Sequence, residues 1–553
     1  MSAPQVPGEG PLVLVVGAGP VGVTAAVMLA DRGVRVLVVD RHADFYPLPR
    51  AVHVDDEIRR VLQGLAPDVP MDPLFMPTGG LRLLDAKHRT MAEFSRSRPV
   101  GEHGHPQANM FDQPELEAWL RERLATRPSA VLAGGYELVG LEQDAAGVRA
   151  ALREPSGDVV TVEAAAVLGC DGANSTVRDL IGARLADLRF TERWLVVDVR
   201  SPHPLDAWLG VHQVCDPRRA ATFMQVRDGR YRFEFRLRDG ETADELMAPD
   251  RLAELVRPWT KDLPFGDLEL LRSAEYTFKA RVADRWRDRR VFLLGDAAHL
   301  TPPFIGQGLC AGVRDAANLT WKLADVLHGR LAEGVLDSYQ AERVPPATAL
   351  VRKAVLVGRV MTGGQDAAAV VRKVALTALC RVPGFGTAVL DAPPPPLPAG
   401  DLVLRRRADG RRARPGHLLP QPAVVADGRR VPLDGVLGAG PAVLTLDAPS
   451  DDLVRAAMDL GARVVRVLPA GAVPSGGPGR PGVAEVVDVD GGLGRWFAAA
   501  RAASVAVRPD RVVLAQHGAR DGGRALAARL DAWRRRHAAV PAAGLRQDVA
   551  PLG

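Results

Sequence analysis

The chain has 553 residues, enough for about three domains, and its hydrophobic content of 47% supports large buried cores. No run of 18 or more apolar residues lacks charges, so the sequence predicts no membrane span. The net charge of +5 comes mostly from arginines in stretches without interleaved aromatic residues, which argues against a nucleic-acid partner.

The cysteines and the N-terminus indicate the compartment. Met1-Ser2-Ala3-Pro4 shows neither the basic nor the apolar region of a signal peptide. Four cysteines, at positions 170, 215, 310 and 380, are too few for a disulfide scaffold and form no CxxC pair. We therefore expect a cytoplasmic protein. We expect no metal site, because pairs such as His53 with Asp55 lack a third ligand at suitable spacing.

The first 40 residues predict a nucleotide-binding unit. Residues 12–16 and 34–39 are apolar runs typical of buried parallel strands. A glycine-rich turn and a helix starting near Pro20 lie between them, and the N–H groups of such a helix start suit a pyrophosphate. An acid at the end of the second strand suits ribose hydroxyls, although this motif alone does not separate FAD from NAD. The residues assigned to the cofactor here are Gly17, Gly19, Pro20, Gly22, Asp40 and Arg41.

Two later segments favour FAD. An apolar run at 165–168 leads to Asp171-Gly172, and a second run at 291–294 leads to Gly295-Asp296. The loop Gly306-Gln307-Gly308 follows and opens a helix that continues beyond residue 318. Free N–H groups at such a helix start suit the electron-rich edge of a reduced flavin.

Residues 295–323 resemble the second FAD fingerprint of the class A flavoprotein aromatic hydroxylases, the p-hydroxybenzoate hydroxylase fold. Asp171-Gly172 resembles the DG motif of that family, which is implicated in contacts with FAD and NAD(P)H. The resemblance implies that Asp296 holds the ribityl chain and that Pro303 lies beside the flavin ring. It further implies that the backbones of Gly308 and Leu309 face the pyrimidine edge.

Three more positions are assigned by the same resemblance. Arg50 and Gln113 match an arginine and a glutamine that the family places near the FAD. Cys310 stands where many members have Asn, and a thiol does not supply the amide of that Asn.

Within the family the chain is most similar to the 3-(3-hydroxyphenyl)propionate hydroxylases and the actinobacterial polyketide hydroxylases, in residues 49–57 and 214–219. The implied fold class is α/β, with a Rossmann-like FAD-binding domain, an inserted β-sheet substrate domain and a C-terminal thioredoxin-like domain. The expected segments are 1–185 and 281–390 for the FAD-binding domain, 186–280 for the substrate sheet, 391–399 for a Pro-rich linker, and 400–553 for the C-terminal domain.

The apolar patterns predict elements in the last two domains. Strands are expected at 195–199, 221–226 and 231–237 in the middle sheet, and at 442–446, 464–468 and 512–515 in the C-terminal domain, with helices at 452–460 and 525–535. The C-terminal domain contains no cysteine, which excludes thiol redox chemistry there. We expect it to serve in packing or dimer formation, so a monomer and a homodimer both remain open.

The resemblance implies the reaction. NADH or NADPH reduces FAD, O2 adds at C4a to give a hydroperoxide, and one oxygen passes to a phenolic ring, for instance of a 3-(3-hydroxyphenyl)propionate-type substrate. One alternative is a tailoring monooxygenase, a hydroxylase or Baeyer–Villiger enzyme, acting on a polycyclic aromatic natural product. The non-enzyme alternative is an FAD-binding regulatory module.

Candidates for substrate chemistry follow from residue type. His53 titrates in the range of a catalytic base, while Asp55 and Asp56 are either bases or caps of the helix that follows. Arg232 and Arg236 lie four residues apart on a predicted strand and share one face. They either bind a substrate carboxylate bidentately or form a solvated outer face.

Overall fold

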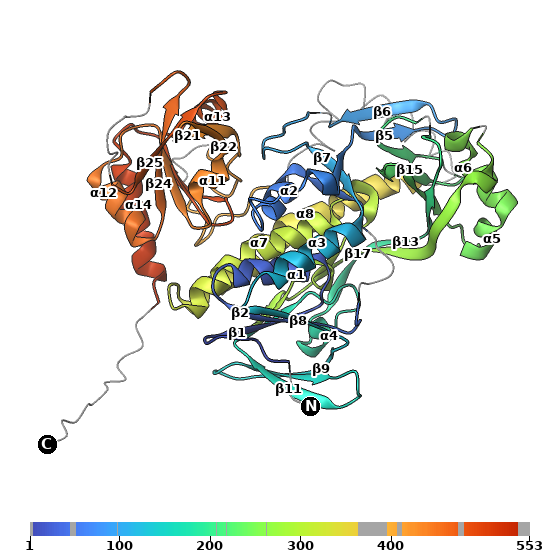
Figure 1. The fold of residues 1–553 in the computed structure, drawn as a ribbon, viewed down its shortest axis with the longest axis horizontal. Coiled ribbons are helices and arrows are strands. Elements are labelled where there is room, and N and C mark those ends of the chain that lie inside the picture. Colours follow the sequence, from blue (N-terminus) through green and yellow to red (C-terminus); the bar gives the residue numbers. More distant parts are fainter. Residues whose placement is uncertain are drawn as a thin grey trace.

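The computed structural model describes residues 4–44, 51–96, 98–205, 207–216, 218–261, 263–362, 395–405, 412–473 and 481–539. Figure 1 shows the C-terminal domain as a lobe at one end of the molecule and a large curved sheet at the other. The long helices α7 (Gly308–Leu327) and α8 (Asp337–Thr362) run between them. Among the described residues, no helix is long and apolar enough to span a membrane.

The N-terminal unit is built on a mostly parallel sheet, here called the parallel sheet. Its strand order is β18 (Arg287–Asp288), β19 (Val291–Leu293), β12 (Ala166–Gly169), β1 (Leu12–Val16), β2 (Arg35–Asp40) and β8 (Ala130–Gly134). The two predicted nucleotide-binding strands are confirmed as β1 and β2, which pair in parallel. Helix α1 (Pro20–Ala30) is apolar on almost every side because it packs against both α7 and α3 (Gln113–Ala125).

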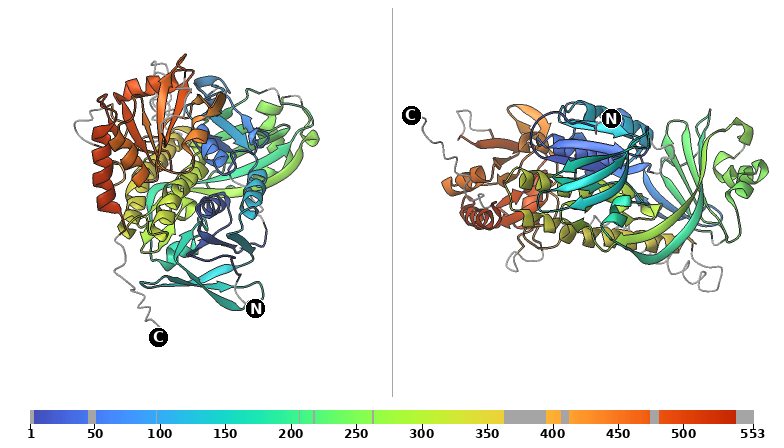
Figure 2. Two further views of the ribbon diagram at one scale, coloured as in Figure 1. Left: turned by 60° about the vertical axis from the view of Figure 1, so that its left-hand side comes forward. Right: turned by 90° about the horizontal axis from the view of Figure 1, so that it is seen from below.

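The large sheet covers the parallel sheet's carboxyl edge and curves strongly (Figure 2). Its order is β20 (His299–Leu300), β17 (Glu269–Ala283), β13 (Leu185–Arg200), β16 (Arg230–Arg236), β15 (Ala221–Arg227), β14 (Val211–Val214), β5 (Gly80–Leu84) and β6 (Thr90–Ser95). The three predicted middle strands are confirmed within β13, β15 and β16. Strands β5 and β6 join this sheet from far upstream, through parallel pairing of β5 with β14.

The two faces of the large sheet differ in chemistry because side chains alternate along each strand. On β16, Phe233 and Phe235 point to the outer face and pack with Trp259 of α6 (Pro249–Thr260) in a core completed by α5 (Ala243–Met247). Arg232 and Glu234 therefore point to the inner face, toward the parallel sheet. A polar face turned inward is unusual, since charged side chains are seldom buried.

Two small sheets and two short helices complete the N-terminal unit. One sheet has the order β11 (Val159–Ala164), β10 (Val148–Arg153), β9 (Glu137–Gln143), and the other β3 (His53–Asp55), β7 (Ala108–Phe111), β4 (Phe75–Pro77). Helix α2 (Asp56–Gln63) follows β3, and α4 (Thr176–Leu180) follows the turn after β12. Asp55 caps α2 by accepting from the backbone N–H of Ile58 at 3.0 Å, as one of the two sequence alternatives predicted.

The C-terminal domain has a thioredoxin-like layering of helices on a mixed sheet. The strand order is β22 (Arg429–Pro432), β21 (Ala423–Ala426), β25 (Val483–Asp488), β24 (Arg463–Pro469), β23 (Ala442–Thr445), β26 (Ser504–Val507) and β27 (Val513–His517). Its helices are α11 (Leu433–Leu437), α12 (Asp451–Asp459), α13 (Gly492–Ala500) and α14 (Arg524–His537). The three strands and two helices predicted here are confirmed, each within two residues.

Buried ion pairs join the C-terminal domain to the rest of the chain. Arg60 of α2 binds Asp434 of α11 bidentately, with Nε and Nη2 at 2.7 and 2.8 Å from the carboxylate oxygens. Glu342 of α8 accepts from Lys322 of α7 and from Arg508 after β26, each at 2.8 Å. Because every member of this second network is buried and paired, the lobe is held in one orientation.

Candidate active site

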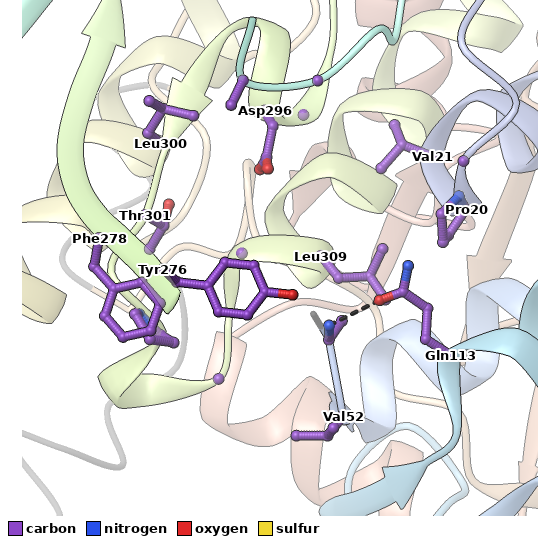
Figure 3. A pocket seen from close by; sticks show the side chains of 18 of the residues that line it. Pro20, Val21, Val52, Gln113, Tyr276, Phe278, Asp296, Leu300, Thr301 and Leu309 are labelled. Atoms are coloured by element: carbon purple, nitrogen blue, oxygen red, sulfur yellow. Dashed lines mark hydrogen bonds between the residues drawn. The ribbon is translucent and has the colours of Figure 1, made fainter. Parts of the chain in front are cut away.

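A cavity of about 760 Å³ lies between the carboxyl edge of the parallel sheet and the inner face of the large sheet. Its walls come from the β1–α1 turn, the end of β2, the turn after β12, the loop before α7 and strands β13–β17. In Figure 3 the side chains of Tyr276, Asp296 and Leu309 point into it from three different elements. The cavity therefore brings together all three motif segments that the sequence singled out.

The β1–α1 turn has the form of a nucleotide cradle. Gly17 has φ +107°, and a Cβ there would lie 2.3 Å from the carbonyl oxygen of Cys170. A Cβ on Gly22 would lie 2.0 Å from the carbonyl oxygen of Gly17. Gly19 and Pro20 begin α1, whose first N–H groups face the cavity side of the turn. Only glycine fits at positions 17 and 22, and without side chains there the backbone of the turn can approach a ligand closely.

Asp40 organises this cradle from the end of β2. Its carboxylate accepts from the N–H of Ala18 at 2.7 Å and from the N–H of His42 at 2.8 Å. Each oxygen keeps a further lone pair, which suits the ribose hydroxyls expected there. Arg41 lies beside it in the cavity wall. This donor and acceptor set fits an adenosine diphosphate, the nucleotide half of FAD.

Asp171 and Asp296 mark the next two walls. Asp171 accepts from the Ser175 hydroxyl at 2.5 Å and from the Val177 N–H at 3.0 Å, and burial raises its pKa. Its carboxylate therefore stabilises the turn after β12, and the residue also lines the cavity. Asp296, in the short turn η3 (Gly295–Ala297) after β19, points into the cavity (Figure 3). The left-handed Gly295, with φ +59°, allows this turn.

The loop before α7 forms the wall where the resemblance places the flavin ring. Pro303 begins η4 (Pro303–Ile305), and Gly306 follows with φ +61°. Gly308 and Leu309 open α7 and line the cavity. No acid occupies the first turn of α7, so its N–H groups remain available to a flavin edge.

His53 fixes this loop from strand β3. Its Nδ1 lies 3.3 Å from the carbonyl oxygen of Gly306, so the neutral ring donates from Nδ1 and keeps its lone pair on Nε2. Burial, assisted by the positive charge of Arg96, lowers the pKa of His53 to about 4. The ring is therefore neutral near pH 7 and is a weak base.

Gln113 and Cys310 brace the walls rather than project freely. Gln113, at the start of α3, accepts from the N–H of Ala51 at 2.8 Å and donates to Glu117 at 2.6 Å (Figure 3). Cys310 is fully buried outside the cavity lining, with its sulfur 3.9 Å from the carbonyl oxygen of Gly306. Arg50, which the resemblance also places near the FAD, lies outside the described residues.

The two candidate substrate arginines already bind carboxylates of the chain. Arg232 lines the cavity and donates to Asp198 from Nε at 2.7 Å and from Nη2 at 3.0 Å. Arg236 lies outside the cavity lining, with Nε 2.5 Å from Glu192. They share one face as expected, but Arg232 binds Asp198 bidentately, and Arg236 donates through Nε to Glu192. Asp55 and Asp56 likewise lie outside the lining.

Sequence reasoning missed several residues on the inner face of the large sheet. The lining includes Gln213 of β14, Thr222 of β15, Glu234 of β16 and Tyr276 of β17. One sequence signal for them was present in residues 230–236, where charged and aromatic side chains alternate strictly and so indicate a strand with one charged face. The sequence did not show that the charged face would be covered.

Family models match most of the chain. A model described as FAD binding domain matches residues 12–354, and one described as HcaD C-terminal domain matches residues 416–532. The chain is 35% identical over 520 residues to a 3-(3-hydroxy-phenyl)propionate/3-hydroxycinnamic acid hydroxylase 2 of Burkholderia vietnamiensis, covering 91% of this chain and 93% of the relative. It is also 35% identical over 515 residues to a hydroxylase of the same description from Mycobacterium sp. strain KMS, covering 91% and 87%.

Solved structures agree in fold. A ternary complex of aklavinone-11 hydroxylase with FAD and aklavinone matches with a TM-score of 0.72 and 25% identity, covering 96% of this chain and all of that one. The flavin-dependent monooxygenase PieE, in complex with FAD and substrate, matches with a TM-score of 0.75 and 23% identity over 96% of this chain.

Proposed function

The chain belongs to the FAD-binding family of class A aromatic hydroxylases, and from this premise we propose that it hydroxylates a phenolic ring held against the inner face of the large sheet. It is a flavin-dependent monooxygenase that consumes NAD(P)H and O2. The observation that supports the placement of the substrate is that one cavity is lined both by the loop before α7 and by Tyr276 and Glu234 of the large sheet.

FAD supplies the redox chemistry when bound, accepting reducing equivalents from NAD(P)H and activating O2. The chain would hold it through the α1 start and Asp40 at the nucleotide end and through Asp296 at the ribityl chain. Pro303 and the backbones of Gly308 and Leu309 would position the ring edge. The large sheet would cover the ring and exclude water, which otherwise diverts activated oxygen to hydrogen peroxide.

The substrate of first choice is a 3-(3-hydroxyphenyl)propionate-type phenol, because two relatives with 35% identity carry that activity in their descriptions. A neutral polycyclic phenol is the second candidate. The pairing of Arg232 with Asp198 favours it, since a bidentate anchor for a substrate carboxylate is already engaged. Free thiols at the described cysteines agree with the proposed cytoplasmic setting.

The test measures NADH and NADPH oxidation by the FAD-loaded protein, with and without 3-(3-hydroxyphenyl)propionate. Stimulated oxidation and a product heavier by one oxygen atom are expected. Product formation only from a neutral polycyclic phenol would transfer the assignment to the second candidate. A protein that binds FAD but oxidises NAD(P)H at the same rate with every phenol tested would instead be a regulatory module.

A further inference from the structure

Three oxygen-bearing side chains form a row across the inner face of the large sheet. Gln213 on β14 lies directly opposite Thr222 on β15, and Thr222 lies directly opposite Glu234 on β16. All three line the cavity and are at least nine-tenths buried. Side chains directly opposite in antiparallel strands lie about 5 Å apart at Cβ, so the row presents acceptors at regular spacing.

Two members of the row have acceptor atoms that the described residues do not satisfy. The Nε2 of Gln213 donates to the carbonyl oxygen of Phe304 at 2.6 Å, which fixes the amide, while its Oε1 has no partner. Among the described residues, none donates a hydrogen bond to the Glu234 carboxylate, although it is only 7% exposed. Buried acceptors usually have donors, so the Oε1 of Gln213 indicates a ligand that donates, and the Glu234 carboxylate in the cavity wall is open to the same ligand.

The charges around Glu234 are balanced on the same face. Arg232 and Arg272 both bind Asp198, with nitrogen-to-oxygen distances of 2.7 and 2.9 Å. This triad carries a charge of +1, which an ionised Glu234 neutralises. The charged or titratable side chains nearest to Glu234 on this face are Asp198 from β13, Arg272 and Tyr276 from β17, and Arg232 and Arg236, with its partner Glu192, on β16. Arg230 shares the face at the start of β16 and pairs with Asp112.

We propose that Glu234 binds the ring hydroxyl of the substrate and takes its proton during hydroxylation, with Thr222 and Gln213 extending the same acceptor row. This inference rests on the proposed function and names a catalytic residue for it. The phenolic O–H bond breaks, its electron pair stays on the oxygen, and the proton bonds to the carboxylate. The overall reaction consumes phenol, O2, NAD(P)H and one proton and yields dihydroxy product, NAD(P)+ and water.

Basicity distinguishes Glu234 from His53, the other titratable candidate in the lining. Burial raises the pKa of Glu234 to about 7, whereas burial lowers the pKa of His53 to about 4. Proton transfer from a phenol, whose pKa is near 10, is therefore less unfavourable to Glu234 than to His53, by about three pH units. The positive charges of Arg232 and Arg272 favour the resulting phenolate, and a phenolate is a stronger carbon nucleophile at its ortho and para positions.

The row also restricts the substrate class. It offers acceptors and one carboxylate, so it favours a phenol that presents hydroxyl donors and disfavours a second carboxylate at this wall. A propionate side chain would have to lie elsewhere in the cavity. Gln213 and Glu234 are separated by two strand spacings, about 10 Å, which matches donors on opposite ends of a fused-ring phenol.

The first experiment follows the hydrogen bond from the phenol hydroxyl on binding, without turnover. The FAD-loaded protein is titrated at pH 8 with 3-(3-hydroxyphenyl)propionate and with 2-naphthol, and near-ultraviolet difference spectra report the red shift of the phenol band that a strong acceptor causes. We expect this signal with the wild type and a clearly smaller one in Glu234→Gln, because an amide oxygen is a weaker acceptor than a carboxylate. The matched control is Glu275→Gln on β17, whose carboxylate pairs with Arg193 away from the cavity and should leave the signal unchanged.

The second experiment separates a base from a structural role. Glu234→Gln should slow hydroxylation of an un-ionised phenol about 100-fold or more. It should also remove the wild-type loss of rate below about pH 7. The hydroxylation rate of a fluorinated analogue that is already ionised at the assay pH should fall far less in this variant. Retained FAD absorbance reports that the variant folds.

The results that would overturn the role of Glu234 differ from those that would overturn the proposed hydroxylase function. Equal losses for ionised and un-ionised phenols, or a full rate with the variant, would overturn the role of Glu234 while the hydroxylase assignment stands. Failure of the wild type to form product from either phenol counts against the proposed function itself. An unchanged red shift in Glu234→Gln would assign the contact with the phenol hydroxyl to another group and overturn the proposed role of Glu234.

Discussion

The raised pKa of Glu234 predicts a measurable cost in stability. Burial disfavours the charged form of its carboxyl and raises the pKa from the ordinary 4.5 to about 7. Between these values the unfolded chain binds fewer protons than the native protein, so stability falls as pH rises. The effect is absent below about pH 4.5 and complete above about pH 7. A difference of about 2.5 pH units at about 1.4 kcal/mol each amounts to about 3.5 kcal/mol at pH 8.

Glu234→Gln should remove this pH-dependent cost. The assay compares apparent melting temperatures of variant and wild type from pH 5.5 to 8.5, both loaded with FAD and without substrate. Taking the difference cancels the other titrating groups. The melting temperature of the variant should rise relative to the wild type as pH rises, by about 5 °C in total for a folded unit as large as the N-terminal one. The increase should level off above pH 7.5.

Glu275→Gln on β17, two strands away from β16, is a control in which the pKa shift has the opposite sign. The hydrogen bond from Arg193 lowers the pKa of this exposed carboxyl, so it stabilises the fold above its unfolded pKa and by little, since the pair is solvated. Its melting difference should be small and should not grow between pH 6 and 8. A pH-independent difference for Glu234→Gln would refute the reasoning, because it would mean that Glu234 is not buried as a charged group.

Further predictions concern the cofactor and the domain contact. Gly17→Ala should abolish FAD retention, measured as absorbance per protein, because its Cβ would lie 2.3 Å from a carbonyl oxygen. Asp296→Ala should weaken FAD about 10-fold to 100-fold by equilibrium titration, and unchanged affinity would contradict its placement. His53→Ala should slow hydroxylation about tenfold but leave flavin reduction unchanged in stopped flow, because it frees Gly306. Glu342→Gln should lower stability by about 3 kcal/mol in urea, because Lys322 and Arg508 would lose their shared carboxylate; an unchanged midpoint would exclude this network as a stabiliser.

The nucleotide-binding unit was predictable because its signals are local. The turn at Gly17 needs a left-handed backbone and close approach, which only glycine allows, and the strands on either side are continuous apolar runs. Helix capping by Asp55 was local in the same sense. Such features are decided by a few neighbouring residues, so one sequence suffices to find them.

The substrate wall was not predictable because its meaning depends on distant partners. Arg232 was identified as a charged residue on a strand face, but its pairing with Asp198 joins residues 34 positions apart. Strands β5 and β6 joined the large sheet from a segment more than 100 residues upstream of β14. Alternation in residues 230–236 fixed which side chains share a face and left open which face is covered.

The buried charge networks around Glu342 and around Glu234 differ in a way that bears on function. Around Glu342, the carboxylate accepts from Asn318, Lys322 and Arg508, so a buried charge is fully satisfied and joins two domains. Around Glu234 the neighbouring arginines are directed at Asp198, and its own carboxylate faces the cavity. Apolar side chains at that position would be no less stable, since buried charges gain little net free energy. Folding therefore explains the first network, and the second is explained by a ligand that donates a hydrogen bond.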